Sequence, residues 1–344
     1  MREMIPGYRN LPGRHCGSGA MRNLLHHYCE LDLEEEVVFG LGSGIDCIYL
    51  ANPGFEPPVI VFGRSVTMEA DVGSALGIDY RETVDPDDGT AWEDVRREVV
   101  EGHPTMLCGD IFYLDYRHFK VHFPGHRFVL LGFDDEKRLA YVADRVDPDP
   151  QPCSYDALAR SRNSPAGMSV LNLWGKFHGR ERKHSLEEAC GLAIDRSVAR
   201  MTGGDRSQAD LLKAAPGAGA LEISTGLEGL ARFAAEVSLW SKHADPRFLA
   251  FYASQTFEEF GTGGGNFRRM FAAFLRWAHG LVPDRAPAGC ADLAARSAAG
   301  WTDLSGILKM ASKAPEDETL WKRAALKASE IHGLESALFD ELSR

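Results

Sequence analysis

The chain has 344 residues, of which 50 are acidic and 38 basic, so its formal net charge is −12. This charge argues against a nucleic-acid-binding protein held by a broad basic surface. Apolar residues make up 44% of the chain and charged residues 26%, which argues against a disordered chain, a collagen-like repeat or a coiled-coil rod and favours a globular protein of about two domains.

The sequence contains no membrane, secretion or metal signal. It has no uncharged apolar run of about 18 residues, and its first 19 residues lack the hydrophobic stretch and cleavage pattern of a signal peptide. We therefore expect a cytoplasmic protein that does not bind a membrane. The cysteines form no CxxC pair, which indicates neither a disulfide framework nor a zinc ribbon. His118, His122 and His126 are spaced by four, but Pro124 and Gly125 interrupt any helix that would align them. We expect no metal and no cofactor.

Up to about residue 175 the chain is predicted to mix short strands with helices. Helical patterns lie at 17–28, 68–76 and 91–101, and short apolar runs predict strands at 59–62, 106–108, 128–133, 139–143 and 168–173. This combination favours an α+β domain.

After residue 176 the composition changes. From residue 185 onward the chain is rich in Ala, Leu, Glu and Arg and lacks alternating strand patterns. Residues 266–281 place their apolar side chains on one helical stripe beneath Arg268, Arg269 and Arg276. We therefore expect a first domain over residues 1–178 and an all-α second domain over 179–344.

Cys16 is the cysteine whose neighbours set it apart. Residues 12–19, PGRHCGSG, have the composition of a loop, and a helical pattern continues from Ala20. Cys16 thus falls at or just before a helix N-terminus, where unpaired N–H groups and the helix dipole lower the pKa of a thiol and can bind an oxyanion. An ordinary residue of a helix cap is the alternative interpretation.

His126 and Asp144 lie at the open end of a predicted hairpin. A turn centred on Asp135 makes them direct cross-strand neighbours on one face, with Cβ atoms about 4.5–5.5 Å apart. A loop one residue longer shifts the pairing by one. In the direct register the carboxylate can orient the imidazole while the other ring nitrogen faces a thiol. A solvated histidine and aspartate are the alternative.

These segments resemble the N-terminal domain of the butirosin biosynthesis protein H family. The resemblance is carried by HCGSGAMRNLLHHY from residue 15, VVFGLGSGIDCIYL from 37, GDIFYLDY from 109, VHFPGHRFVLLGFDDE from 121 and YVADR from 141. That domain is similar to papain-like and double-glycine-leader peptidases, which implies a papain-like α+β fold with the N-terminal helix packed on an antiparallel sheet. The later segment FGTGGGNFRR, from residue 260, resembles the helical domain usually fused to it.

The resemblance implies a catalytic triad, with Cys16 as nucleophile, His126 as general base and Asp144 as the residue that orients it. The named member is an acyltransferase that moves an amino-acyl group from an acyl carrier protein to an amine of an aminoglycoside. We therefore expect a cysteine acyltransferase of natural-product or antibiotic biosynthesis that forms an acyl-enzyme. Its partners would be a small amine acceptor and an acyl carrier protein or small acyl thioester.

The oxyanion donor is less clear. Papain-like enzymes carry a side-chain donor, usually Gln, shortly before the nucleophile, and this chain has no Gln there. Asn10 could donate through its amide, and Arg14 or a backbone N–H such as that of Gly17 could replace it.

A glycine-rich loop at 261–265 precedes the helix that carries Arg268 and Arg269. Backbone N–H groups, as at Gly263 and Gly264, and the guanidinium charge could bind a substrate carboxylate or the phosphate of a pantetheine arm. A plain turn and helix cap is the alternative. The acidic run at 34–36 has the pattern of a solvated turn.

Two other functions stay open. A cysteine amidase or peptidase would share the three residues but use water, and a non-catalytic binding protein would keep them as a relic. The acyl group, the acceptor and the oligomeric state, a homodimer included, are also open.

Overall fold

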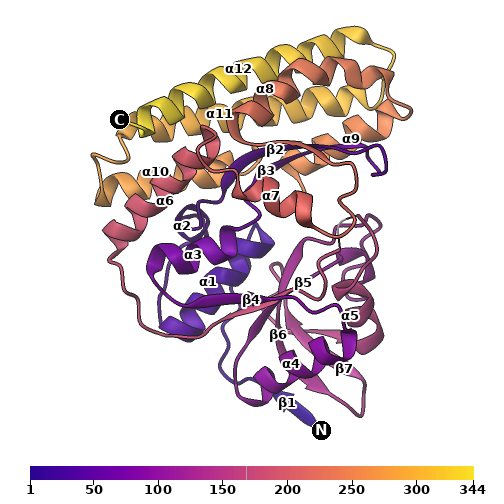
Figure 1. Cartoon of the computed structure of the whole chain (residues 1–344), viewed down its shortest axis with the longest axis vertical. Coiled ribbons are helices and arrows are strands. Elements are labelled where there is room, and N and C mark those ends of the chain that lie inside the picture. The colour runs from indigo at the N-terminus through magenta and orange to yellow at the C-terminus, as the bar shows by residue number, and fades with distance from the viewer. Residues whose placement is uncertain (168) are drawn as a thin grey trace. The chain divides into compact units, whose positions relative to one another are not determined.

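The computed structural model describes residues 1–167 and 169–344, and the chain divides into two compact units that alternate along the sequence (Figure 1). Unit 1 comprises Met1–Val38, Leu76–Lys183 and Ala214–Ala218, and unit 2 comprises Phe39–Ala75, His184–Lys213 and Gly219–Arg344. The sequence predicts a single boundary, between residues 178 and 179. The second segment of the chain instead lies with the C-terminal helices, because its side chains, such as Tyr49 and Val61, belong to their hydrophobic core.

Unit 1 is built on a seven-stranded sheet in the order β4-β9-β5-β6-β7-β8, with β1 paired to the far end of β6. Its strand pairs are antiparallel. The strands are β1 (Arg2–Met4), β4 (Tyr80–Thr83), β5 (Thr105–Gly109), β6 (His126–Asp134), β7 (Leu139–Ala143), β8 (Gln151–Ser154) and β9 (Trp174–Phe177).

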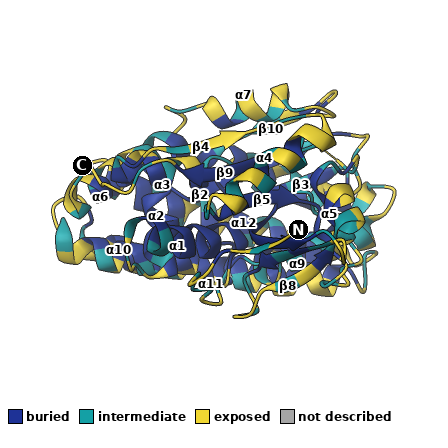
Figure 2. Ribbon diagram, turned by 90° about the horizontal axis from the view of Figure 1, so that it is seen from below, coloured by how far each residue is buried: buried dark blue, intermediate teal, exposed yellow. Residues whose placement is uncertain are grey.

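Helices cover this sheet. The helix α1 (Cys16–Cys29) packs on β6 and β9, α4 (Asp88–Val100) on β5 and β6, and α5 (Tyr155–Arg162) on β5, β7 and β8; a short 3-10 helix, η1 (Ile111–Tyr113), follows β5. Residues of the apolar face of α1, such as Leu24 and Leu25, are fully buried, and most of the helix is coloured as buried in Figure 2. The expected N-terminal helix packed on an antiparallel sheet is therefore present.

Unit 2 combines a three-stranded antiparallel sheet, in the order β10-β2-β3, with most of the remaining helices. The strands are β2 (Ile45–Ala51), β3 (Val59–Arg64) and β10 (Glu222–Ser224). The helices are α3 (Met68–Leu76), α6 (Leu186–Met201), α7 (Ser207–Ala214), α8 (Gly226–Glu236), η2 (Val237–Lys242), α9 (Pro246–Glu258), α10 (Arg268–Leu281), α11 (Ala288–Ala311) and α12 (Glu318–Leu342), while α2 (Glu35–Leu41) begins in unit 1 and ends in unit 2. Buried Trp240, Trp301 and Trp321 lie in the core of unit 2.

Two predictions about secondary structure need correction. Residues 179–344 are mostly helical but not all-α, because β10 pairs with β2; a strand of three residues is too short to show alternation. The strand predicted at 168–173 is wrong over its described residues, and Met168 lies outside them. Leu171 and Asn172 have φ values of 47° and 56°, which form a turn, and the strand β9 begins only at Trp174. No helix of the described residues is both long and apolar enough to span a bilayer.

Candidate active site

Cys16 is the first residue of α1, as the sequence predicted. His15 is the N-cap residue: its backbone is extended, and its Nδ1 accepts the backbone N–H of Ser18 at 3.1 Å. Backbone N–H groups in the first turn of a helix have no acceptor within the helix, and the dipole makes this end positive. The N–H of Gly17 belongs to this turn, and we retain it as a proposed oxyanion donor.

The structure brings His126 and Asp144 together with Cys16. His126 opens β6 and Asp144 directly follows β7, and the histidine Nε2 lies 3.0 Å from the Asp144 Oδ2. The His126 ring also interacts with the Cys16 thiol, and this interaction lowers the pKa of the thiol and raises the pKa of the imidazole. Since the carboxylate takes Nε2, Nδ1 is the nitrogen left for the sulfur.

The strand register that achieves this differs from the one predicted. Asp134 pairs with Leu139, so the turn is longer than expected, and a bulge between Leu130 and Gly132 shifts the pairing again, so that Val129 faces Ala143. Continued to Asp144, this register places Phe128 opposite it, and His126 lies two residues further along the same face. His126 and Asp144 are therefore diagonal rather than direct neighbours. Without the bulge they would point to opposite faces, because side chains alternate along a strand.

Electrostatics favour a thiolate and an imidazolium. Burial opposes ionisation of the Cys16 thiol, but the interactions with His15 and His126 outweigh it and hold the thiol pKa well below its ordinary value. Burial also disfavours the imidazolium of His126, but Asp144 and Cys16 raise its pKa to about 9. For Asp144, burial is outweighed by His126 and Arg117, which hold the carboxyl pKa well below its usual range.

Asp144 is itself held by residues that the sequence analysis did not single out. Its Oδ2 accepts the hydroxyl of Tyr116 at 3.1 Å and lies 3.5 Å from the Arg117 guanidinium, and its Oδ1 accepts the backbone N–H of Arg145 at 2.6 Å. Tyr116 lies in the GDIFYLDY segment that carried part of the family resemblance, which was the available signal.

Asn10 does not have the geometry of an oxyanion donor. Its amide nitrogen donates to the backbone carbonyls of Asp144 and Asp147, and its Oδ1 accepts the amide of Asn23 at 2.9 Å. These bonds tie the loop before α1 to the chain after β7, so Asn10 positions the Asp144 backbone and its amide donors are already used.

Glu35 is a second residue that the sequence analysis missed. The acidic run at 34–36 was predicted to be solvated, but Glu35 is 4% exposed. Its carboxylate accepts the backbone N–H groups of Arg14 and His15, each at 2.8 Å, and the Ser18 hydroxyl at 3.1 Å. A buried carboxylate thus fixes the loop that leads into the nucleophile.

The glycine-rich loop of unit 2 binds a carboxylate from the protein itself. Gly263 and Gly264 take positive φ values of 69° and 84°. The N–H of Gly265 donates to Glu258 at 2.9 Å, and the Arg269 guanidinium lies 3.1 Å from the same carboxylate. The Glu258 side chain therefore occupies an anion-binding position of the predicted kind.

Arg268 does not fit the substrate-binding role that was predicted for it. It is 1% exposed, and its guanidinium makes two bonds of 2.8 Å to Glu335 and further bonds to the carbonyls of Gly63 and Asn266. The guanidinium also lies over the ring of Trp301. For Arg268 the structure supports a core ion pair.

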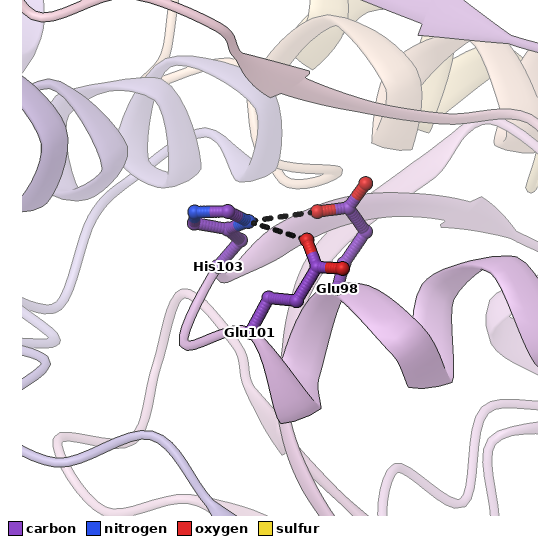
Figure 3. Close-up of side chains that lie close together, drawn as sticks. All are labelled: Glu98, Glu101 and His103. Atoms are coloured by element: carbon purple, nitrogen blue, oxygen red, sulfur yellow. Dashed lines mark hydrogen bonds and ion pairs between the residues drawn. The ribbon is translucent and has the colours of Figure 1, made fainter.

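Three side chains of the types that bind metal ions lie close together at the end of α4. Glu98 and Glu101 both approach Nδ1 of His103, at 2.9 and 3.6 Å (Figure 3). The ammonium of Lys176 binds Glu98 and lies 3.3 Å from the same His103 nitrogen. Lys176 already supplies a positive charge there, so the cluster is explained as an ion-pair network.

The fold and the site define a protein in which a cysteine at the start of a helix meets a histidine and an aspartate from an antiparallel sheet. A family model described as Butirosin biosynthesis protein H, N-terminal, matches residues 15–145, and one described as Domain of unknown function (DUF4872) matches residues 156–342. The chain belongs to the butirosin biosynthesis protein H family, which confirms the resemblance. Among curated proteins, no sequence matches the chain.

Proposed function

We propose that the protein is a thiol-dependent acyltransferase that carries an acyl or amino-acyl group from a thioester donor, through Cys16, to an amine. The observation that carries this proposal is the series of interacting side chains from Cys16 through His126 to Asp144, in which His126 and Asp144 are hydrogen-bonded. A thiol, an imidazole and an orienting carboxylate in this order are the parts of an activated nucleophile.

The first half-reaction loads the enzyme. The Cys16 thiolate attacks the carbonyl carbon of the donor thioester, and a new C–S bond forms. The bond from this carbon to the donor sulfur then breaks, and the imidazolium of His126 gives its proton to the departing thiolate. The products are a free donor thiol and an acyl group held as a thioester on Cys16.

The second half-reaction transfers the acyl group from Cys16 to the amine. The amine nitrogen attacks the acyl-enzyme, neutral His126 takes the amine proton, and Cys16 leaves as a thiolate. An amide is released and the thiolate–imidazolium pair is restored. Asp144 keeps the ring in one orientation throughout, because it holds Nε2.

The family points to the chemical context. Its model is named for a protein of butirosin biosynthesis, so we infer a role in making an antibiotic or related natural product, with an acyl carrier protein or a small acyl thioester as donor. Cys16, His126 and Asp144 are each less than a tenth exposed, which restricts water and favours transfer to an amine over hydrolysis.

Intact-protein mass spectrometry tests the proposal. Wild type, Cys16→Ala and the control Cys29→Ala are incubated with a panel of short aminoacyl and fatty acyl thioesters. Cys29 is a suitable control because burial raises the pKa of its thiol to about 11. We expect a mass increase in wild type and Cys29→Ala that maps to Cys16, is absent from Cys16→Ala and is discharged by added amines.

Two other outcomes would contradict the proposed acyl transfer. Discharge by water at a rate that amines do not change would make the protein a hydrolase. No adduct from any donor, together with a Cys16 that does not react with iodoacetamide at neutral pH, would contradict an activated thiol and favour a binding role.

A further inference from the structure

A second imidazole lies against the proposed nucleophile. His15 is 3% exposed and directly precedes Cys16 at the start of α1, and its ring interacts with the Cys16 thiol. The acyl-transfer steps described above use only His126, so they leave the role of His15 unassigned.

The hydrogen bonds of His15 define which nitrogen carries its proton. Nδ1 accepts the backbone N–H of Ser18 at 3.1 Å, and this needs the Nδ1 lone pair. The Ser18 hydroxyl gives its own proton to Glu35, so it does not compete for that lone pair. A neutral His15 ring therefore has its proton on Nε2, which is the ring nitrogen that can donate a hydrogen bond.

The position of His15 is fixed from both sides. Its backbone N–H is held by the buried Glu35 at 2.8 Å, and its side chain caps α1. The two side chains that the sequence offered as oxyanion donors, Asn10 and Arg14, do not replace His15 in this role. Asn10 has used its amide donors, and the Arg14 side chain is 64% exposed and lies near Glu36.

We propose that His15 is a catalytic residue whose Nε2–H donates a hydrogen bond to the oxyanion that forms when Cys16 attacks the acyl carbonyl. The negative charge develops on the oxygen of the carbonyl carbon that becomes bonded to the Cys16 sulfur, and His15 directly precedes Cys16 in the chain and interacts with its thiol. The proton stays on His15 throughout, and the negative charge returns to the C=O bond when the donor sulfur leaves. This inference rests on the proposed acyl transfer.

The test compares two reactions of Cys16 in wild type, His15→Asn and His15→Gln. Thioester acylation passes through an oxyanion, whereas alkylation by iodoacetamide at the sulfur does not. Asparagine is a good N-cap residue and can still accept the Ser18 N–H, but its amide is too short to replace Nε2. Glutamine keeps an N–H donor on a longer side chain.

We expect His15→Asn to slow acylation by about 10²–10³-fold, the usual effect of losing one oxyanion donor. Its alkylation rate, measured at the pH plateau of each variant, should stay close to wild type. His15→Gln should recover part of the acylation rate. Thermal unfolding followed by circular dichroism reports whether each variant is folded.

Three results would overturn the inference. Equal losses in acylation and alkylation would indicate a structural role, and wild-type acylation in His15→Asn would show that His15 is no oxyanion donor. A shifted pH midpoint of alkylation with normal acylation at the plateau would limit His15 to stabilising the thiolate. If wild type itself forms no adduct with any thioester, the proposed function fails, and the role of His15 fails with it.

Discussion

The charge states of Cys16 and His126 control reactivity at the scale of single residues. The thiol pKa lies well below its ordinary value, and the pKa of His126 is raised to about 9. Between these two values Cys16, the proposed nucleophile, is a thiolate and His126 is an imidazolium. This is the form that the proposed first half-reaction requires, because the imidazolium must protonate the departing donor thiolate.

These shifts predict the pH dependence of both reactions. Alkylation follows the thiolate, so its rate should stay near its plateau at neutral pH, whereas an ordinary thiol loses about tenfold per pH unit below about 8.5. Acylation of Cys16 by a thioester should decline as the pH rises through about 9, where His126 loses its proton. Stopped-flow rates measured from about pH 4 to about pH 11 follow both reactions.

Asp144→Asn provides the variant for this experiment. The amide oxygen can still accept the Nε2–H of His126, but the negative charge that stabilises the imidazolium is lost. The basic limb should therefore move to lower pH by about one to three units. The exposed Asp149 offers a matched control, since Asp149→Asn should leave the limb in place. A limb that stays near pH 9 in Asp144→Asn would contradict the assignment to His126.

Sequence patterns revealed some of these residues and not others. Cys16 was visible because a loop composition gave way to a helical pattern beside it, and His126 and Asp144 because they flank one hairpin. The roles of His15 and Glu35 depend on burial and on bonds between residues 20 positions apart, which leave no local pattern. Asn10 was misinterpreted because the partners of an amide cannot be read from its position alone.

At the scale of elements, the hairpin shows how a register can be predicted wrongly while its contact is predicted correctly. Turn length and bulges are set by backbone conformation, such as the positive φ of Arg138 next to β7, and the charged turn sequence does not specify them. The two deviations together preserve the face on which His126 and Asp144 lie. The histidine and aspartate therefore still meet, by a diagonal contact.

The loop that leads into α1 depends on the first residue of α2. The N–H groups of Arg14 and His15 bind different oxygens of Glu35, so Glu35→Gln, which replaces one oxygen by an NH₂ group, leaves one of the two without an acceptor. Leaving one such buried donor unpaired costs about 1–3 kcal/mol of unfolding free energy, and acylation should slow because His15 and Cys16 are less well held.

Urea unfolding together with the rate of thioester acylation checks this prediction. The neighbouring Glu34 is exposed, so Glu34→Gln is the matched control and should change stability by no more than about 0.5 kcal/mol. Equal stability of the two variants would show that the Glu35 carboxylate does not hold the loop.

At the scale of the whole molecule, the alternation of the two units is what the sequence could not show. Residues 39–75 begin within α2, early in the chain, yet their strands share a core with α8, α9, α11 and α12. A composition change marks where helices begin to dominate, near residue 185, but it cannot show which earlier segment packs against them. The helical character was predicted, and the added sheet was not.

Measuring the stability of Arg268 variants distinguishes a core ion pair from a substrate-binding residue. Removing this guanidinium in Arg268→Ala leaves the Glu335 carboxylate buried without its partner, which typically costs about 3–5 kcal/mol. Arg269→Ala is the natural control, because Arg269 is about half exposed, and an exposed ion pair contributes about 0–1 kcal/mol.

Replacing both core partners, Arg268→Met with Glu335→Leu, should recover much of the loss, since no buried charge then remains unpaired. Thermal and urea unfolding of the three variants measure these differences. A substrate-binding Arg268 would give the opposite pattern, in which Arg268→Ala unfolds like wild type but needs more thioester to reach half its maximal rate of acylation.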